Sequence, residues 1–255
     1  MCSFILCEFF AQYVHKIDLK NNPFYSLYVP INDCRSKTPP LLFTTRVITQ
    51  TNDWNMLSKN PRAIHLLKKN IHKINWRHLS SNPAAISLLT ENYAKISWKK
   101  LSSNYNAGNL LNENIVQIDW NHLSRNTSLH AIHILSQYPE YIDWSWFSAN
   151  PSAIQIIKLE KNAKNINWRW LSANPSDEAV QLLANNPDKI DWKWLSKNTN
   201  PKAISLLKNN TDKINWENLS GNPCDEALQM LKNHPDKINW CKLSRNPSIF
   251  IRVRE

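Results

Sequence analysis

The chain has 255 residues, 12 of them Trp, and carries a formal net charge of +11 with a pI of about 9.4. Only two glycines occur, Gly108 and Gly221, which excludes the glycine-rich loops that bind phosphate in nucleotide-dependent enzymes. The five cysteines are odd in number and include no CxxC pair, so we expect reduced thiols in a cytosol-like compartment.

Residues 1–50 carry no clear repeat and are expected to form an irregular N-terminal cap or a small appended module. The stretch from Met1 to Val14 is apolar, but it includes Glu8 and is too short to span a bilayer. A buried segment of the cap is therefore favoured over a membrane or targeting element. Residues 51–255 form a second, repetitive region.

Nine tryptophans recur at a fixed period through the second region. The first three intervals are 22 residues long and the next five are 24. These residues are Trp54, Trp76, Trp98, Trp120, Trp144, Trp168, Trp192, Trp216 and Trp240. A period of this length is typical of stacked-repeat architectures.

Each repeat is expected to begin with a short helix at its tryptophan. The preceding residue is always Asp, Asn or Ser, and these side chains accept hydrogen bonds from the free amides of a first helical turn. A large apolar residue follows three positions later, on the same helix face, as Leu195 follows Trp192. A Ser comes next, with an Asn two positions after it, and we interpret this polar cluster as the end of the helix.

A second helix is predicted to start at Asn-Pro in most repeats, because Asn caps a helix and Pro fits its first position. The following Ala-Ile-x-Leu-Leu pattern places its apolar residues on one helical stripe. An Asn near the end, such as Asn210, suits a left-handed C-terminal cap. Two-residue insertions fall at element ends, as at Ser176, which we expect to cap a longer second helix.

These patterns predict an all-α fold: an α-solenoid of about nine two-helix repeats of 22–24 residues. A leucine-rich-repeat horseshoe has a similar period but a different core spacing, since its motif is L-x-x-L-x-L-x-x-N. One repeat buries too few side chains to fold alone. The nine tryptophans are therefore expected to form a shared interior seam between neighbouring repeats.

The C-terminal end of the chain is expected to carry a shortened last helix over residues 246–254. Its apolar residues, such as Phe250 and Ile251, would be incompletely covered, because no further repeat follows them. Self-association through this end is therefore a hypothesis.

No P-loop, G-x-G-x-x-G, H-E-x-x-H, G-x-S-x-G or zinc-finger spacing is present. His130 and His133 could share a helix face, with His122 nearby in sequence, but no carboxylate or Cys partner accompanies them. A surface pair is therefore favoured over a metal site. The sequence predicts no enzyme activity, no cofactor and no bound metal.

The second residue after each tryptophan lies about 200° around the helix from it and so faces away from the seam. This position and the one before it predict a basic and aromatic strip, referred to below as the strip. Its residues are Arg77, His78, Lys99, Lys100, His122, Trp146, Arg169, Trp170, Lys193 and Trp194. The three tryptophans of the strip could form a binding surface or could pack on one another to stiffen the stack.

The repeat W-x-x-L-S-x-N-P-x-A-I-x-L-L-x-x-N-x-x-K-I-[DN]-W, over about residues 51–248, resembles the uncharacterised tandem repeat proteins of giant DNA viruses. This resemblance implies a viral protein that acts in the host cytoplasm or in the virus particle. Residues 1–53 fall outside it.

Three functions remain open from the sequence. The favoured one is a non-catalytic repeat scaffold that mediates protein–protein interaction, without a membrane partner. The alternatives are nucleic-acid binding through the strip, which suits the basic charge, and a structural role in a virion. A generally solvated basic surface would also explain the charge, because Lys189, Lys213 and Lys237 each follow an Asp.

Overall fold

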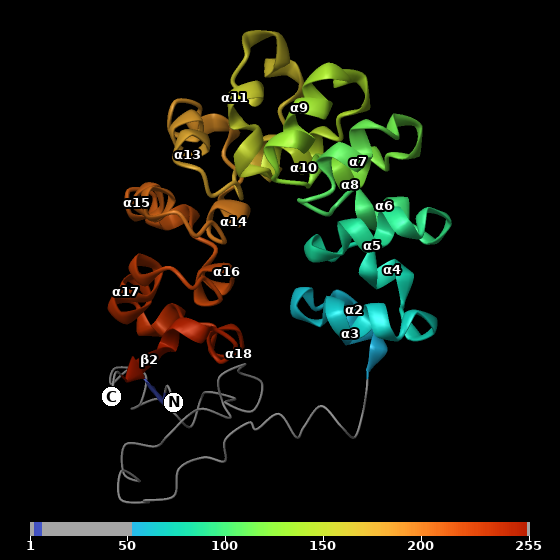
Figure 1. The fold of residues 1–255 in the computed structure, drawn as a ribbon. Coiled ribbons are helices and arrows are strands. Elements are labelled where there is room, and N and C mark those ends of the chain that lie inside the picture. The colour runs from blue at the N-terminus through green and yellow to red at the C-terminus, as the bar shows by residue number, and fades with distance from the viewer. Residues whose placement is uncertain (1–2, 7–52, 254–255) are drawn as a thin grey trace, which may run out of the picture. The chain divides into compact units, whose positions relative to one another are not determined.

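The computed structural model describes residues 3–6 and 53–253 (Figure 1). Helices follow one another from Trp54 to Ile249, which confirms the predicted all-α fold. Contacts divide the chain into two compact units, residues 41–167 and residues 1–40 with 168–255. The expected boundary near residue 50 and most of the expected N-terminal cap lie outside the described residues.

Each of the nine first helices begins at its tryptophan, as predicted. In residues 41–167 they are α2 (Trp54–Lys59), α4 (Trp76–Leu79), α6 (Trp98–Leu101), α8 (Trp120–Ser124) and α10 (Trp144–Ala149). In residues 168–255 they are α12 (Trp168–Leu171), α14 (Trp192–Leu195), α16 (Trp216–Ser220) and α18 (Trp240–Leu243). The preceding side chain caps the helix in most repeats, as Asp191 does by accepting from the Trp194 amide, whereas Ser97 makes no such bond.

The second segment of each repeat is helical, but several copies start as a 3₁₀ turn at Pro-x-Ala. In residues 41–167 these segments are η6 (Pro61–Ala63) with α3 (Ile64–Lys69), η8 (Pro83–Ala85) with α5 (Ile86–Glu91), α7 (Gly108–Asn112), α9 (Leu129–Gln137), and η12 (Pro151–Ala153) with α11 (Ile154–Ile157). In residues 168–255 they are α13 (Asp177–Ala184), α15 (Pro201–Lys208), α17 (Asp225–Asn233) and η17 (Pro247–Ile249). The predicted caps hold at Asn60, whose side chain accepts from the Arg62 amide, and at Ser176. The predicted start at Asn222-Pro223 is wrong, because α17 begins at Asp225 and the preceding Cys224 makes no side-chain cap bond.

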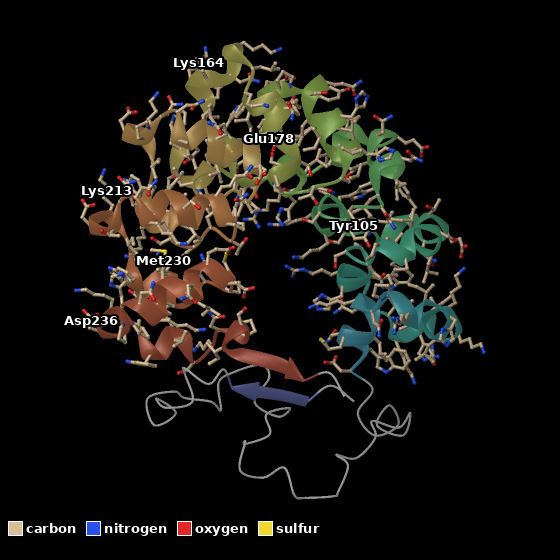
Figure 2. All side chains as sticks on the ribbon, turned by 90° about the vertical axis from the view of Figure 1, so that its left-hand side faces the viewer. Tyr105, Lys164, Glu178, Lys213, Met230 and Asp236 are labelled. Carbon is tan, nitrogen blue, oxygen red and sulfur yellow. The ribbon has the colours of Figure 1, made fainter. Side chains whose placement is uncertain are left out.

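The segment before the next tryptophan contains a further 3₁₀ helix that the sequence analysis missed. These are η7 (Ile71–Lys73), η9 (Tyr93–Lys95), η10 (Ile115–Gln117), η11 (Pro139–Tyr141), η13 (Glu160–Asn165), η14 (Pro187–Lys189), η15 (Thr211–Lys213) and η16 (Pro235–Lys237). In residues 168–253, Lys213 and Asp236 on these turns are exposed, whereas Met230 of α17 is buried among the helices (Figure 2).

The expectation of left-handed Asn caps is wrong. None of the residues that the structure describes has a positive φ, and Asn210 has φ −141° and ψ 56°. Its side-chain amide donates to the Leu206 carbonyl at 2.9 Å. The side chain thus satisfies the end of the helix while the backbone continues directly into η15, so no left-handed reversal is needed.

The buried core consists mainly of Leu, Ile and Ala residues of the two helices and of the turn before each tryptophan, together with Phe147, Val180 and Met230. All nine repeat tryptophans are only half-buried, which corrects their predicted place as the interior seam. Each large indole lies at the border of the core, where a 3₁₀-turn side chain often covers it. Examples are Tyr141, stacked on Trp120 with 4.6 Å between ring centroids, and Lys213, whose Nζ is 4.8 Å from the centroid of the Trp192 ring.

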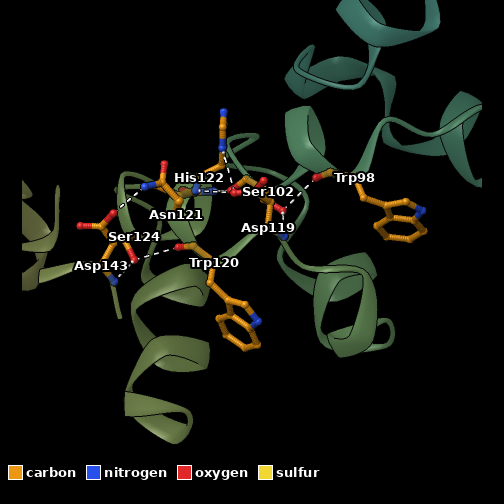
Figure 3. Close-up of polar contacts among 9 residues, drawn as sticks. Trp98, Ser102, Asp119, Trp120, Asn121, His122, Ser124 and Asp143 are labelled. Atoms are coloured by element: carbon orange, nitrogen blue, oxygen red, sulfur yellow. Dashed lines mark hydrogen bonds and ion pairs between the residues drawn. The ribbon is translucent and has the colours of Figure 1, made fainter. Parts of the chain in front are cut away.

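A buried serine joins successive repeats (Figure 3). Ser102 has no exposed surface; its Oγ donates to the Trp98 carbonyl at 2.8 Å and accepts from the Asp119 amide of the next repeat at 3.0 Å. Ser124 does the same with Trp120 and Asp143. Within the two units, the bond from the next repeat's amide recurs at Ser58, Ser80, Ser148, Ser172, Ser196 and Ser220.

A buried asparagine makes a second link between repeats. The Asn126 amide nitrogen donates to the carbonyls of Ser102 and Asn104 in the previous repeat, at 3.0 and 3.1 Å, and its Oδ1 accepts from the Ser128 amide at 2.9 Å. The same three bonds recur at Asn104, Asn150, Asn198, Asn222 and Asn246. Over the described part of the chain, no buried side-chain nitrogen or oxygen lacks a hydrogen-bond partner.

The C-terminal segment differs from the predicted helix over residues 246–254. The helix ends after η17, and β2 (Phe250–Val253) then pairs antiparallel with β1 (Ser3–Leu6), with Ser3 opposite Val253 and Leu6 opposite Phe250. The Phe-Ile-x-Val sequence favours a strand when another backbone is present to pair with it. Self-association through this end remains a prediction. Within residues 3–6 and 53–253, no helix is both long and apolar enough to cross a membrane.

Replacement of Ser102 by Ala tests the serine link. The Asp119 amide would lose its partner, so we expect the free energy of unfolding to fall by about 1–3 kcal/mol. The neighbouring Ser103 is exposed and provides a matched control. Ser103→Ala should change stability by less than about 0.5 kcal/mol in the same urea titration. Equal effects of the two changes would contradict the role assigned to Ser102.

Replacement of Gly108 by Ala tests the close approach of α7 and α9. A Cβ at position 108 would lie 2.4 Å from the Cβ of His130, whereas at Gly221 the nearest atom, the Asn218 carbonyl oxygen, would be 3.7 Å away. Gly108→Ala should therefore destabilise the protein by about 1–3 kcal/mol, although Ala is the better helix former. Gly221→Ala should be neutral in the same thermal melts. A stabilised Gly108→Ala protein would show that the two helices separate easily.

Candidate binding surface

The residues one, two and five positions after each repeat tryptophan are here called the first-helix face, which is described separately within residues 41–167 and within residues 168–255. Within residues 168–255, the ring centroids of Trp170 and Trp194 are 5.0 Å apart, and Lys197 Nζ lies 4.7 Å from the Trp194 centroid. Glu217 of one repeat and Lys242 of the next are 3.7 Å apart. The Trp170–Trp194 and Glu217–Lys242 contacts show that, within residues 168–255, the first helices of consecutive repeats are neighbours on this face.

In residues 41–167 the strip consists of Arg77, His78, Lys99, Lys100, His122 and Trp146. Arg77 and Lys99 are exposed, and the other four are half-buried. Arg125 belongs to the same surface although it is not among the predicted residues, and its guanidinium carbon lies 3.3 Å from the Trp146 ring centroid. The spacing could have revealed it, because positions two and five are three residues apart and share a helix face.

In residues 168–255 the strip consists of Arg169, Trp170, Lys193 and Trp194. Arg169 and Lys193 are exposed, and both indoles are half-buried. The Trp170 and Trp194 rings pack together at 37°, and the Arg169 guanidinium carbon lies 5.4 Å from the Trp194 centroid. The two tryptophans therefore pack on each other and still keep part of their surface open to solvent.

Charge is distributed very unevenly between the first-helix face and the rest of the repeats. Residues 53–253 contain 25 Lys and Arg and 16 Asp and Glu. The face holds a single acidic residue, Glu217, and ten basic residues: Lys59, Arg77, Lys99, Lys100, Arg125, Arg169, Lys193, Lys197, Lys242 and Arg245. This leaves 15 residues of each sign elsewhere, so the whole excess positive charge of residues 53–253 lies on the face.

This distribution corrects the interpretation of the charge as a generally solvated basic surface. The turn lysines Lys189, Lys213 and Lys237 belong to the electrically balanced part of the repeats. Nine of the ten basic residues of the face are exposed, and Lys100 is half-buried. An exposed concentration of one charge sign raises the local concentration of oppositely charged partners.

Two histidines of the strip occupy contrasting electrostatic environments. Burial is the main cause that lowers the pKa of His78 below its ordinary value, and the positive charges of Lys59, Arg77 and Lys100 lower it further. His122 instead contacts a carboxylate, with 2.9 Å between its Nδ1 and Asp119 Oδ1 (Figure 3). Burial opposes ionisation of Asp119, but hydrogen bonds from the His122 backbone and ring outweigh it and lower the Asp119 pKa.

The other histidine pair lies away from the first-helix face. His130 and His133 of α9 line a hollow of about 160 Å³ together with Asn109 and Asn112 of α7. Among residues 3–6 and 53–253, no group of three or more His, Cys, Asp or Glu is placed to hold a metal ion.

Comparison of the chain with protein-family models, with curated proteins and with solved structures gives no match.

The lowered His78 pKa makes stability depend on pH. In the unfolded chain His78 takes up a proton near its ordinary value of 6.5, whereas the folded protein takes it up at lower pH. The contribution of neutral His78 to the free energy of unfolding is therefore fully present above its unfolded pKa. It is lost as the pH falls toward its folded pKa. Between about pH 7.5 and about pH 5.5 the parent should lose more unfolding free energy than His78→Gln. If urea titrations show the same loss of unfolding free energy for the parent and for His78→Gln, the pH dependence does not arise from His78.

Proposed function

We propose that the chain is a non-catalytic repeat scaffold, an α-solenoid of nine two-helix repeats. The support is the recurrence of the serine and asparagine links in each of the two units. Each link uses side chains of one repeat and backbone of its neighbour, so a repeat is completed only by the next one. This nearest-neighbour dependence is characteristic of solenoid proteins.

The first-helix face then binds an acidic macromolecule, and single-stranded nucleic acid suits it best. The observation that carries this proposal is the concentration of ten basic residues and one acidic residue on the face. Six of the ten are Lys, a residue type that is depleted at protein–protein interfaces. Interfaces with nucleic acid are much more positively charged, and Lys and Arg supply their phosphate contacts. The charge thus favours nucleic acid over the protein partner preferred from sequence.

The aromatic residues of the face complement its charges. The guanidinium carbon of Arg125 lies 3.3 Å from the Trp146 ring centroid, and a guanidinium held against an indole still has N–H groups that can bind a phosphate. Contact with the ring also restricts the side chain before binding, which lowers the entropy lost on complex formation. Partly exposed tryptophans beside cations are typical of sites that hold single strands without sequence preference. The proposed viral origin and cytoplasmic or virion location rest on the repeat resemblance alone.

Neutralisation of Arg77, Lys99 and Lys100 by Gln tests the proposed function. Three fewer phosphate contacts should weaken binding of a labelled oligothymidine by about tenfold or more at low salt. The slope of log K against log salt should fall by about 2, since each single-strand contact contributes about 0.7. Fluorescence anisotropy across a salt series measures both quantities.

The matched control replaces Arg62, Lys69 and Lys95, which are exposed basic residues outside the first-helix face, by Gln. It removes the same charge and should leave both the affinity and the slope close to those of the parent. Equal losses in the two triple variants would contradict the proposed face. If polyglutamate binds and oligothymidine does not, the partner is an acidic protein and the nucleic-acid proposal fails. Duplex DNA serves as a third ligand, and tighter binding to it would contradict the preference for single strands.

A further inference from the structure

A hollow of about 270 Å³ opens on the first-helix face within residues 168–255. It is lined by Lys197, Glu217, Asn218, Gly221, Asn222 and Lys242. Five of these residues occupy first-helix-face positions of three consecutive repeats. Asn222 belongs to the buried asparagine link, so part of the lining of the hollow is also part of the core.

The hollow is unobstructed at residue 221, which has no side chain. The equivalent residue in the other repeats is Lys, Arg, Ser or Ala, and Gly221 is the single glycine among the nine. Its backbone has φ −90° and ψ 0°, which any residue adopts. A Cβ would also meet nothing closer than 3.7 Å. Neither backbone conformation nor packing therefore requires glycine here, and its distinguishing effect is the open volume.

The walls of the hollow carry two cations and one anion. Lys197 and Lys242 are both exposed, and Glu217 lies 3.7 Å from Lys242. Lys197 also connects the hollow to the strip, because its Nζ lies 4.7 Å from the Trp194 ring centroid. Asn218 is fixed in place by donating to the Lys193 carbonyl at 2.9 Å. The lining is thus net positive, and it holds amide and carboxylate groups able to form hydrogen bonds.

We propose that this hollow is a subsite for one nucleotide of the bound single strand. Lys197 and Lys242 bind its phosphate, and the sugar and base occupy the space that Gly221 leaves, with Asn218 and Glu217 at the rim. The volume lies just below the range of about 300–1,000 Å³ typical of small-molecule sites, so it suits one nucleotide unit. This inference rests on the proposed function, because it assigns a place to part of the same ligand.

Gly221→Leu tests the subsite by filling the hollow without changing charge. We expect oligothymidine to bind about tenfold more weakly to this variant, because one nucleotide loses its place. Gly221→Ala is the matched control and should stay within about twofold of the parent, since a methyl group occupies little of the hollow. The double change Lys197→Gln with Lys242→Gln should lower the salt slope by about 1.4, whereas Gly221→Leu should leave it unchanged. Circular dichroism melts confirm that each variant folds.

Thymidine monophosphate provides a second probe that does not depend on the rest of the face. It should bind the parent and Gly221→Ala, and not Gly221→Leu, in calorimetric titrations. Unchanged oligothymidine binding by Gly221→Leu would overturn the subsite and leave the proposed function standing. Binding of the monophosphate without the oligomer would overturn the proposed function, and with it the assignment of the hollow to a nucleotide of a bound strand. Failure to bind either probe would overturn both.

Discussion

The structure depends on hydrogen bonds that cross from one repeat to the next inside the core. Ser102 and Asn126 are buried polar residues, and each bonds to a backbone amide or carbonyl of the adjacent repeat in addition to a partner in its own repeat. A buried polar group without a partner is costly, so any slip between neighbours would leave several groups unsatisfied at once. Apolar packing alone tolerates rearrangement, whereas these bonds fix one register.

This internal linkage leaves the outer surface of the first helices free to vary. The positions that hold the stack together lie three, four and six residues after each tryptophan, and they carry Leu, Ser and Asn, with Phe147 in place of Leu in one repeat. The intervening positions make few structural demands, so they accommodate Met56, Lys100, Trp146 or Asn218 in the same place. A scaffold of this kind separates the residues that maintain the fold from those that choose a partner.

Much of the local structure could be predicted from the sequence, because caps and apolar stripes depend on nearby residues. The start of α14 at Trp192 and the cap at Ser176 follow directly from such rules. The role of Ser102 in joining two repeats could not be predicted by these rules, because its partner, the Asp119 amide, lies 17 residues away. A small polar residue after a helix is equally expected where the helix simply ends. The strip was predicted, and Arg125 was missed although its spacing from His122 places the two on one helix face. The hollow at Gly221 could not be predicted, because it depends on how separate helices are placed side by side.

The pairing of β1 with β2 has a consequence for how the molecule unfolds. A terminal unit of a repeat array has a neighbour on one side only, so fraying begins there. Here β2 is paired with β1 at residues 3–6, which are almost the full length of the chain away in sequence. Closing so long a loop carries a large entropic cost, so we expect the β1–β2 pair to form after the helices. Trimming a few residues from the start of the chain would thus loosen its opposite end.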